Sequence, residues 1–368
     1  MTTDVVHEGL EGVLVSETRI SHVDGERGRL IVAGHDVEAL AASRGFEAAA
    51  ALVFAANGEP ADEGDVAAAL AEGRARAFAR ISSLGDALAH ADGMDALRTA
   101  VSHLPETAKR TDIVAAVGVF AAAWARIRAG QAPIAPHEGA RHAEAILAML
   151  GGAADASRAR ALDAYLVTVL DHGFNASTFT ARVIASTQAD VVSAVVGGIG
   201  ALKGPLHGGA PGPVLELLDA IGTPERARAA IAAELAAGRR IMGMGHRVYR
   251  TRDPRAQVLE RAIEQLERAT TSAGSAHDRA LRSRLALARA VEREAEAQLE
   301  ARYPGRALRA NVEFYTAVLL SSLEVPPALF TPLFASARVA GWVAHYDEQQ
   351  KRGRLIRPSA RYVGTLPA

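Results

Sequence analysis

The sequence predicts a mainly α-helical protein, and three observations lead to this prediction. Alanine and arginine, which both favour helices, dominate long segments of the chain. Apolar residues make up 49% of the sequence but aromatic residues only 5%, which indicates helices that pack through small side chains. From about Asp36 onward, apolar residues recur at helical spacing, with glycine or proline in the gaps. A chain of 368 residues is long enough for two or three domain-sized units.

The segment before Asp36 does not share this pattern. Between residues 9 and 34 the apolar residues alternate only briefly, and turn-forming pairs such as Asp24-Gly25 interrupt them. Short alternation between turns predicts a small β-hairpin or an irregular arm near the N-terminus.

Helical spacing and boundary residues predict eight helices between this arm and residue 190. Gly130 ends the fifth helix, and residues 131–136, which contain two prolines, form a predicted linker. The predicted ranges are 37–43, 46–57, 64–81, 93–103, 111–129, 139–150, 157–170 and 175–187.

A stretch rich in glycine and proline, residues 203–213, divides the chain. An apolar run at 191–202 leads into it, and a helical pattern at 214–221 leads out. Four glycines and three prolines in eleven residues exclude a continuing helix or a central strand. His207 is therefore predicted to lie on a stiff loop between two helices.

Boundary signals are sharper beyond this loop. Thr223-Pro224-Glu225 and Asp253-Pro254 each combine a capping residue with proline at the first helical position. The later predicted helices run from 224 to about 238, from 254 to about 269, from 278 to 302 and from about 328 to 346. Between them lie a polar loop at 270–276 and a break at 326–327, and a basic, extended tail follows at 351–358.

Composition excludes several classes of protein. The net charge of −1 gives no indication of binding to nucleic acid or to a membrane surface. The absence of cysteine excludes thiol chemistry and disulfides. The longest apolar runs have 12 residues, too few to span a bilayer, and the N-terminus does not resemble a signal peptide. From these two observations we expect a cytoplasmic protein. The histidines lack metal-ligand spacing and no phosphate-loop motif occurs, so we expect no metal and no cofactor.

Three histidines lie in loops beside glycine, at predicted element boundaries. They are His172 in the loop at 171–175, His207 in the central loop, and His246 in the loop at 243–247. For any one of them, a helix joint with a surface histidine explains the pattern equally well. Three such loops together favour a binding or catalytic site, since functional groups are concentrated on loops held by a rigid scaffold.

The loop that begins at His246 is strongly basic. Four arginines follow within ten residues, and Arg255 falls in the first turn of the helix after Asp253. Arginine there opposes the helix dipole unless an anion is near. The pattern favours a carboxylate or phosphate site over the alternative, a solvated run of surface charge.

Two further charged residues stand in apolar surroundings. Glu313 begins a buried-looking helix, where it is either an N-terminal capping group or a base whose pKa is raised by burial. From the residues alone, the capping interpretation is favoured. Arg338 adjoins a small-residue face of the last helix, so it needs an anionic partner if it is buried and is an ordinary surface arginine if it is not.

Taken together, these segments resemble the citrate synthase family, in the same order from Gly9 to Gly364. The most specific motifs are Asp-His-Gly-Phe-Asn-Ala-Ser-Thr at 171–178, Gly-Pro-Leu-His-Gly-Gly-Ala at 204–210, Gly-His-Arg-Val-Tyr at 245–249, Asp-Pro-Arg at 253–255 and Asn-Val-Glu-Phe-Tyr at 311–315. The resemblance implies a mainly α-helical, two-domain homodimer. Residues 1–206, completed by 315–368, would form the large domain, and 207–314 the small domain with the CoA-binding and catalytic loops.

The resemblance also implies an activity, the condensation of acetyl-CoA with oxaloacetate followed by hydrolysis to citrate and CoA. Acetyl-CoA is then a substrate rather than a cofactor. Three residues would be catalytic: Glu313 as the base, His207 as the donor to the enolate oxygen, and His246 as the group that polarises the ketone. The implied oxaloacetate-binding residues are His172, Asn175, Arg255, Phe334, Arg338 and, from the partner subunit, Arg357. The implied CoA-binding residues are Gly243, Met244, Gly245, Arg250 and Arg306.

The sequence departs from the family pattern at two places. Glu313 stands where the family usually has aspartate, and one extra methylene moves a carboxylate by roughly 1 Å, which can change a rate by about 100-fold. The central loop continues Ala210-Pro211-Gly212 where Ala-Asn-Glu is usual. The β-rich N-terminal region of the NADH-binding, hexameric enzymes is not seen, so we expect a dimer without that regulation.

Two alternatives remain open at this stage. A 2-methylcitrate synthase, which uses propionyl-CoA, has the same motifs, and one methyl group in an apolar pocket changes specificity by only about 1–3 kcal/mol. A catalytically weak paralogue that binds CoA or a dicarboxylate is the alternative of another class, and Glu313 is its only support.

Overall fold

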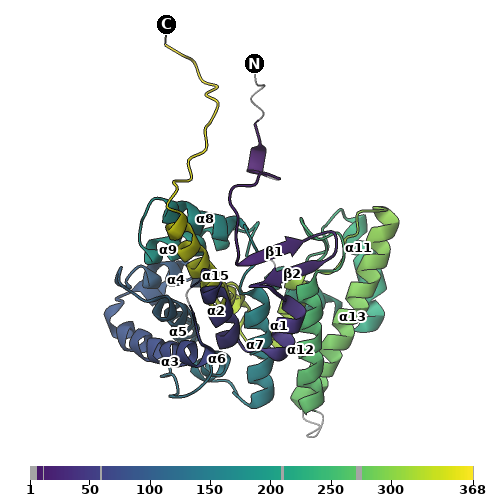
Figure 1. Cartoon of the computed structure of the whole chain (residues 1–368). Coiled ribbons are helices and arrows are strands. Elements are labelled where there is room, and N and C mark those ends of the chain that lie inside the picture. The colour runs from purple at the N-terminus through teal and green to yellow at the C-terminus, as the bar shows by residue number, and fades with distance from the viewer. Residues whose placement is uncertain (1–5, 11, 59, 209–210, 271–275, 368) are drawn as a thin grey trace.

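The computed structural model describes residues 6–10, 12–58, 60–208, 211–270 and 276–367. These parts are mainly α-helical, as predicted, with a small sheet near the N-terminus (Figure 1). The helices in the first half are α1 (Val37–Ser43), α2 (Phe46–Ala55), α3 (Glu63–Arg80), α4 (Gly93–Val101), α5 (Arg110–Arg128), α6 (His142–Leu150), α7 (Ala156–Val169) and α8 (Ala176–Ser186). Those in the second half are α9 (Val191–Leu202), α10 (Pro211–Ile221), α11 (Ala227–Ala236), α12 (Pro254–Thr270), α13 (Ala276–Arg302), α14 (Val312–Ser322) and α15 (Phe330–Arg352).

The N-terminal sheet contains the predicted hairpin. Its strands β1 (Ser21–Asp24) and β2 (Arg29–Val32) are antiparallel, with Ser21 opposite Val32. A third strand, β3 (His35–Asp36), pairs with β2 and was not predicted. It forms because Ala33 and Gly34 both adopt positive φ, 46° and 85°, which reverses the chain directly after β2.

Each helix predicted before residue 203 is present within three residues of its predicted bounds. Aspartate and asparagine cap several of them by accepting backbone N–H bonds at the first turn, as Asp155 does for α7 and Asn175 for α8. Gly130 ends α5 with φ of 70°, as expected of a left-handed stop.

Three boundaries beyond residue 203 differ from the prediction by three residues or more. Helix α11 begins at Ala227 rather than at residue 224, because Pro224–Arg226 form a 3₁₀ turn. Helix α10 begins at Pro211, inside the stretch taken as a loop, because the first turn of a helix needs no N–H donors and accepts proline at 211 and 213. Helix α15 continues past residue 346 to Arg352, where Gly353 with φ of 65° ends it. Residues 209–210 of the central loop and 271–275 of the predicted polar loop lie outside the described residues.

Helices α5 and α15 form the centre of the molecule. Both are buried around most of their circumference, and α5 packs against α3, α4 and α15. Small residues allow close approach, as at Gly198 of α9, where an added Cβ would lie 2.9 Å from the ring of Trp342. Figure 1 shows α3, α4 and α9 on one side, α11 and α13 on the other, and the β1–β2 hairpin between them. Among the described helices, none is both long and apolar enough to cross a membrane.

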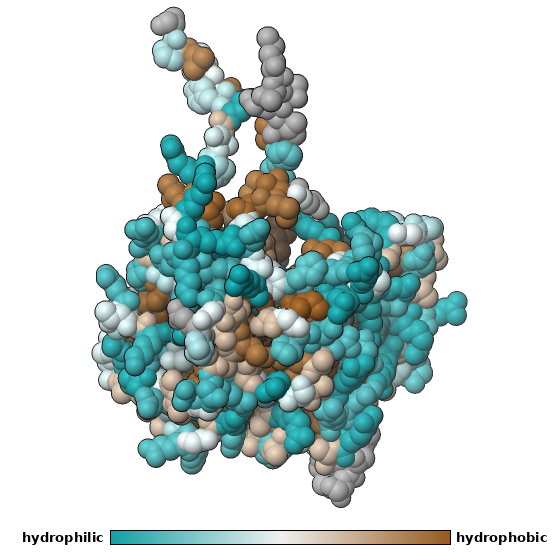
Figure 2. All heavy atoms as spheres, in the orientation of Figure 1, coloured by the Kyte–Doolittle hydropathy of each residue, from teal (hydrophilic) through white to brown (hydrophobic). Residues whose placement is uncertain are grey.

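The two terminal segments leave the body on the same face (Figure 1). Figure 2 shows hydrophobic side chains gathered where they emerge. The exposed apolar residues of these segments are Val6, Leu10, Val13, Leu14, Val15, Leu355, Tyr362, Val363 and Leu366. Apolar side chains of this number on two extended arms favour burial against another surface.

Candidate active site

His172 lies in the tight turn between α7 and α8. Its Nε2 is 3.1 Å from the hydroxyl of Tyr249, and its ring meets the ring of His246 edge-on at 5.5 Å. Burial, reinforced by the positive charge of Arg255, holds the pKa of His172 well below 6.5. His172 is therefore neutral at neutral pH.

His207 is oriented by the first turn of α8. Its Nε2 lies 2.8 Å from the Ser177 hydroxyl and accepts the Ser177 backbone N–H at 3.3 Å. Because a backbone N–H can only donate, these bonds assign the imidazole hydrogen to Nδ1. Burial and then the charge of Arg338 lower the pKa of His207 to about 4. A neutral imidazole that carries its hydrogen on Nδ1 can donate a hydrogen bond to a substrate oxygen.

His246 is fixed by its own loop. Its Nδ1 accepts the backbone N–H groups of Val248 and Tyr249 at 3.0 and 3.1 Å, which assigns the hydrogen to Nε2. Burial, and then the charge of Arg255, lower the pKa of His246 to about 4. The ring of Tyr249 packs against both histidines, 4.7 Å from His246 and 5.6 Å from His172, so the three rings form one cluster.

Arg255 is buried against Asp253. Its Nε and Nη2 donate to the two carboxylate oxygens at 3.0 and 2.7 Å, and the pair is 4% and 1% exposed. Nη2 also lies 3.3 Å from Nε2 of His246. Nη2 of Arg255 and Nε2 of His246 both carry hydrogens and can only donate, so they do not bond to each other. Oxygen acceptors of a ligand would satisfy both donors.

Glu313 stands in the first turn of α14, but it is not the capping residue. The cap is Asn311, whose Oδ1 accepts the Glu313 N–H at 3.1 Å and whose Nδ2 donates to the carbonyl of Gly245 at 2.8 Å. Burial raises the pKa of the Glu313 carboxyl, and the nearby charge of Arg255 opposes that rise. With capping assigned to Asn311, the carboxyl has the surroundings expected of a general base.

Arg338 of α15 is 1% exposed. Its Nε donates to the carbonyl of Val169 at 2.8 Å, and its guanidinium lies 4.6 Å from the ring centre of Phe334. Burial lowers the pKa of Arg338 to about 10, so it stays charged, and among the described residues no carboxylate lies within 4 Å of it. A buried cation without an ion pair favours an anionic ligand.

The glycines at 243 and 245 bring backbone close to the start of α14. Both have φ near 80–90°, and at Gly243 an added Cβ would lie 2.9 Å from Phe314. Met244 forms an isolated antiparallel bridge with Ala310, and Gly245 N–H donates to the carbonyl of Arg309 at 2.7 Å. These contacts place the glycine segment beside the Glu313 turn.

A groove of about 640 Å³ opens next to this segment. Arginines outnumber carboxylates along it; the charged residues are Arg250, Arg252, Arg289, Arg293, Arg309, Glu260, Glu292 and Glu296. Arg293 has no ion pair among the described residues. Arg306 does not line this groove and instead lies in the turn after α13, 5.6 Å from the ring centre of Tyr303. A groove with excess positive charge suits a phosphorylated ligand.

Arg357 is not brought to the histidines of its own chain. It lies exposed in the extended tail after α15, whose backbone is held at Ile356 by the hydroxyl of Ser186 at 3.0 Å. Asn175, in contrast, is close to the site but engaged, because its Oδ1 accepts the backbone N–H of Thr178 at 3.1 Å, which caps α8, and lies 2.8 Å from the Ser177 hydroxyl oxygen.

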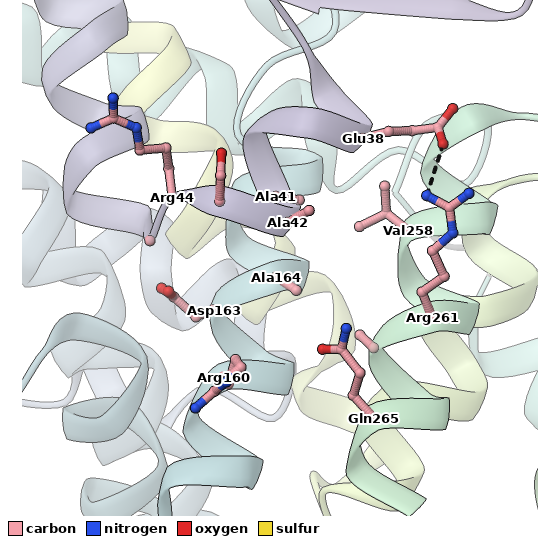
Figure 3. Close-up of a pocket in the computed structure, with 13 residues that line it drawn as sticks. Glu38, Ala41, Ala42, Arg44, Arg160, Asp163, Ala164, Val258, Arg261 and Gln265 are labelled. Atoms are coloured by element: carbon pink, nitrogen blue, oxygen red, sulfur yellow. Dashed lines mark hydrogen bonds and ion pairs between the residues drawn. The ribbon is translucent and has the colours of Figure 1, made fainter. Parts of the chain in front are cut away.

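A second hollow, of about 250 Å³, lies where α12 meets α1 and α7 (Figure 3). Glu38 and Arg261 form an ion pair at 3.1 Å beside it, and burial raises the pKa of Asp163 within it to about 6. None of the predicted site residues lines this hollow, so it belongs to a joint between helices.

Three residues that contact the site were not predicted from the sequence. Tyr249 packs against two histidines, Ser177 orients His207, and Asp253 holds Arg255. The partners His172 and His207 come from segments distant from Tyr249 and Ser177, so no local signal showed these contacts. Asp253 lies two residues before Arg255, but it was interpreted only as a helix cap.

Neutral imidazoles, two buried guanidiniums and a buried carboxyl with a raised pKa, all on a helical scaffold, indicate a class of protein, an enzyme with groups for acid–base catalysis on an anionic ligand. The sequence comparisons make this class specific. The family model "Citrate synthase, C-terminal domain" matches residues 9–359. The citrate synthase of Deinococcus radiodurans is 36% identical over 376 residues, which cover 98% of this chain and 96% of that one.

Two further comparisons agree. The 2-methylcitrate synthase of Mycobacterium tuberculosis is 35% identical over 376 residues, 98% of this chain and 91% of that one. The citrate synthase of Thermoplasma acidophilum, solved in a ternary complex with carboxymethyl coenzyme A and oxaloacetate, superimposes with a TM-score of 0.84 at 25% identity, covering 100% of this chain and 98% of that one. The chain belongs to the citrate synthase family.

Proposed function

We propose that this protein is a citrate synthase that condenses acetyl-CoA with oxaloacetate and hydrolyses the product to citrate and CoA. The observation that carries the proposal is the pair of donors Nε2–H of His246 and Nη2–H of Arg255, whose nitrogens are 3.3 Å apart, near a buried carboxyl that can act as a base. One small 2-oxo acid can meet both donors, with its ketone oxygen at His246 and a carboxylate at Arg255. The thioester methyl is a very weak acid, so a base and an enolate donor are both needed.

The residues support a complete proton balance. The Glu313 carboxylate takes a proton from the methyl group while Nδ1–H of His207 donates to the thioester oxygen, giving an enol-like nucleophile. The methyl carbon then bonds to the ketone carbon of oxaloacetate, and Nε2–H of His246 donates its proton to the ketone oxygen. The proton held by Glu313 then returns to His246 by way of solvent, which restores both groups. Water attacks the thioester carbonyl and the carbon–sulfur bond breaks. One proton of the water goes to the CoA sulfur to give the thiol, and the other leaves as the new carboxylic acid ionises.

The remaining site residues are proposed as binding groups. His172, Arg255 and Arg338, with Arg357 from the partner subunit, would hold the two carboxylates of oxaloacetate, and Asn175 and Phe334 would line that pocket. The glycine segment at 243–245 would meet the adenine end of CoA, and Arg250 and Arg306 its phosphates. For Arg250, the groove that it lines supports this placement by its excess of arginine.

The assembly is also a proposal. We propose a homodimer in which Arg357 enters the partner's site, supported by the exposed apolar residues of both terminal segments and by the outward course of the tail (Figures 1 and 2). Residues 207–314 are proposed as a small domain that closes on the remainder and excludes water from the enolate. The cytoplasmic location expected from the sequence remains a prediction.

One assay tests the activity. Free thiol released from acetyl-CoA is measured with and without oxaloacetate, and thiol release that depends on oxaloacetate is expected. Binding of oxaloacetate without any thiol release would instead identify a catalytically weak binding protein. Propionyl-CoA in the same assay decides between citrate and 2-methylcitrate synthesis, since relatives of both names match this chain at 36% and 35% identity.

A further inference from the structure

The turn of the β1–β2 hairpin lies directly against the loop that carries His246. The backbone N–H of Arg250 donates to the carbonyl of Gly25 at 2.9 Å. A Cβ added to Gly25 would lie 2.9 Å from both the carbonyl carbon and Cγ1 of Val248, and closer still to the carbonyl oxygen. Gly28, with φ of 63°, meets the side chain of Thr251 in the same way. Two glycines in one turn therefore allow the hairpin to lie close to this loop, Gly25 against the backbone of Val248 and Gly28 against the side chain of Thr251.

The other end of the hairpin holds the loop of His172. The Ser21 hydroxyl donates to the buried carboxylate of Asp171 and accepts the Gly173 N–H at 2.9 Å. Val23 reaches Gly173 from the same strand, with Cγ2 3.4 Å from where a Cβ would stand. One strand thus supports the first histidine loop, and the turn that follows it supports the second.

We propose that the β1–β2 hairpin is a positioning element that holds the His172 and His246 loops in the arrangement that oxaloacetate requires, with Ser21 and Gly25 as its positioning residues. The inference rests on the proposed function. Neither histidine loop has regular structure of its own, and catalytic groups must be held within about 0.5 Å of their working positions. Figure 1 shows the hairpin between the two sides of the molecule, where it can act on both.

The tip of the hairpin is not itself part of the core. Leu30 and Val32 of β2 are about 1% exposed and anchor the sheet, whereas the turn residues from 24 to 28 are half-buried or exposed. A change at the tip therefore alters the position of the His246 loop more than the stability of the fold.

The first test is Gly25→Ala. Gly25 does not have positive φ, so alanine adds no backbone strain and acts only by pushing against Val248. A displacement of the loop by roughly 1 Å lowers kcat/KM for oxaloacetate by about 100-fold, while Tm stays within a few degrees of the parent. The matched control is Gly200→Ala on α9, where nothing lies within 4 Å of the added methyl and activity is unchanged. A Gly25→Ala enzyme within twofold of the parent overturns the proposal.

A second variant tests whether the hairpin acts as one unit. Ser21→Ala removes the hydroxyl that holds the His172 loop, and its KM for oxaloacetate is expected to rise. If the hairpin couples the two loops, the Ser21→Ala/Gly25→Ala double variant loses less kcat/KM than the product of the two single losses. Losses that multiply show two independent contacts and overturn the proposal.

Amide hydrogen exchange of the unmodified protein supplies a readout that needs no turnover. The amides of Gly173 and Arg250 are expected to be protected as strongly as the amides of β2, because one cooperative unit holds them. Exchange of Arg250 far faster than β2 overturns the proposal even if Gly25→Ala does not fold. If the unmodified protein releases no thiol, the proposed function fails, while amide exchange and calorimetric binding of oxaloacetate still decide the role of the hairpin.

Discussion

Replacement of Asp253 by asparagine is the sharpest test of the site. The carboxylate accepts four hydrogen bonds, from N, Nε and Nη2 of Arg255 and from the backbone N–H of Val312. It therefore joins the start of α12 to the start of α14, one residue before Glu313. Asparagine has the same shape, but its NH₂ group faces donors and its charge is lost.

The expected cost follows from burial. Asp253 and Arg255 are 1% and 4% exposed, and removing one partner of a buried ion pair costs about 3–5 kcal/mol because the other charge is left unpaired. With an unfolding entropy of about 2.1 cal/mol/K per residue, a chain of 368 residues loses about 4–6 °C in Tm. Activity falls further, by at least about 100-fold, since Arg255 and the Glu313 turn both lose their support.

The assay combines calorimetric Tm with oxaloacetate-dependent thiol release. The matched control is Asp36→Asn, which breaks a surface pair with Arg29 whose side chains are 43% and 51% exposed and which is worth at most about 1 kcal/mol. If Asp253→Asn lowers Tm by no more than the control and keeps parental kcat/KM, the assignment of Asp253 as the link between α12 and α14 is refuted.

Three further predictions concern the base, pH and the dimer. Glu313→Gln should still bind oxaloacetate by calorimetry but lose most turnover, whereas an Asp variant that is faster than the parent would show that glutamate is a handicap here. The free energy of unfolding should fall as pH drops from about 6.5 towards 4. His207 and His246 bind protons in the unfolded chain but stay neutral in the folded protein, where their pKa values are about 4. A Tm that does not change over this pH range contradicts the prediction. Mixing inactive His207→Ala and Arg357→Ala subunits should restore about a quarter of parental activity, because about half of the dimers are mixed and each mixed dimer has one intact site of two. If native mass spectrometry shows mixed dimers but no activity returns, Arg357 does not act in the partner's site.

Much of the helical framework was predictable because its signals are local. Caps such as Asp155 and stops such as Gly130 act within a turn, so the bounds of α5 and α7 follow from neighbouring residues. The exceptions also have local causes. Proline at 211 starts a helix as readily as it breaks one, and the positive φ of Ala33, which produces β3, has no sequence signature.

The candidate site was predictable only in part, because its geometry depends on contacts between distant segments. The three histidines were visible from their glycine neighbours. The partner of each was not: Tyr249 reaches His172 from 77 residues away, and Ser177 reaches His207 from 30. The hairpin carried no signal of its contact with the His246 loop, since Asp24-Gly25 is an ordinary turn pair until the facing backbone is known.

The contacts of the β1 region also have a consequence for how the protein is made. The hydrogen-bond partner of Ser21 is Asp171, which is synthesised 150 residues later. The partner of the Arg19 backbone N–H is the carboxylate of Glu348, which is synthesised 329 residues later. At a synthesis rate of about 5–20 residues per second, Glu348 emerges from the ribosome about 16–66 s after Arg19. The N-terminal segment therefore makes its last contact with the body only when α15 has been made, although the partners of the hairpin in both histidine loops are made earlier.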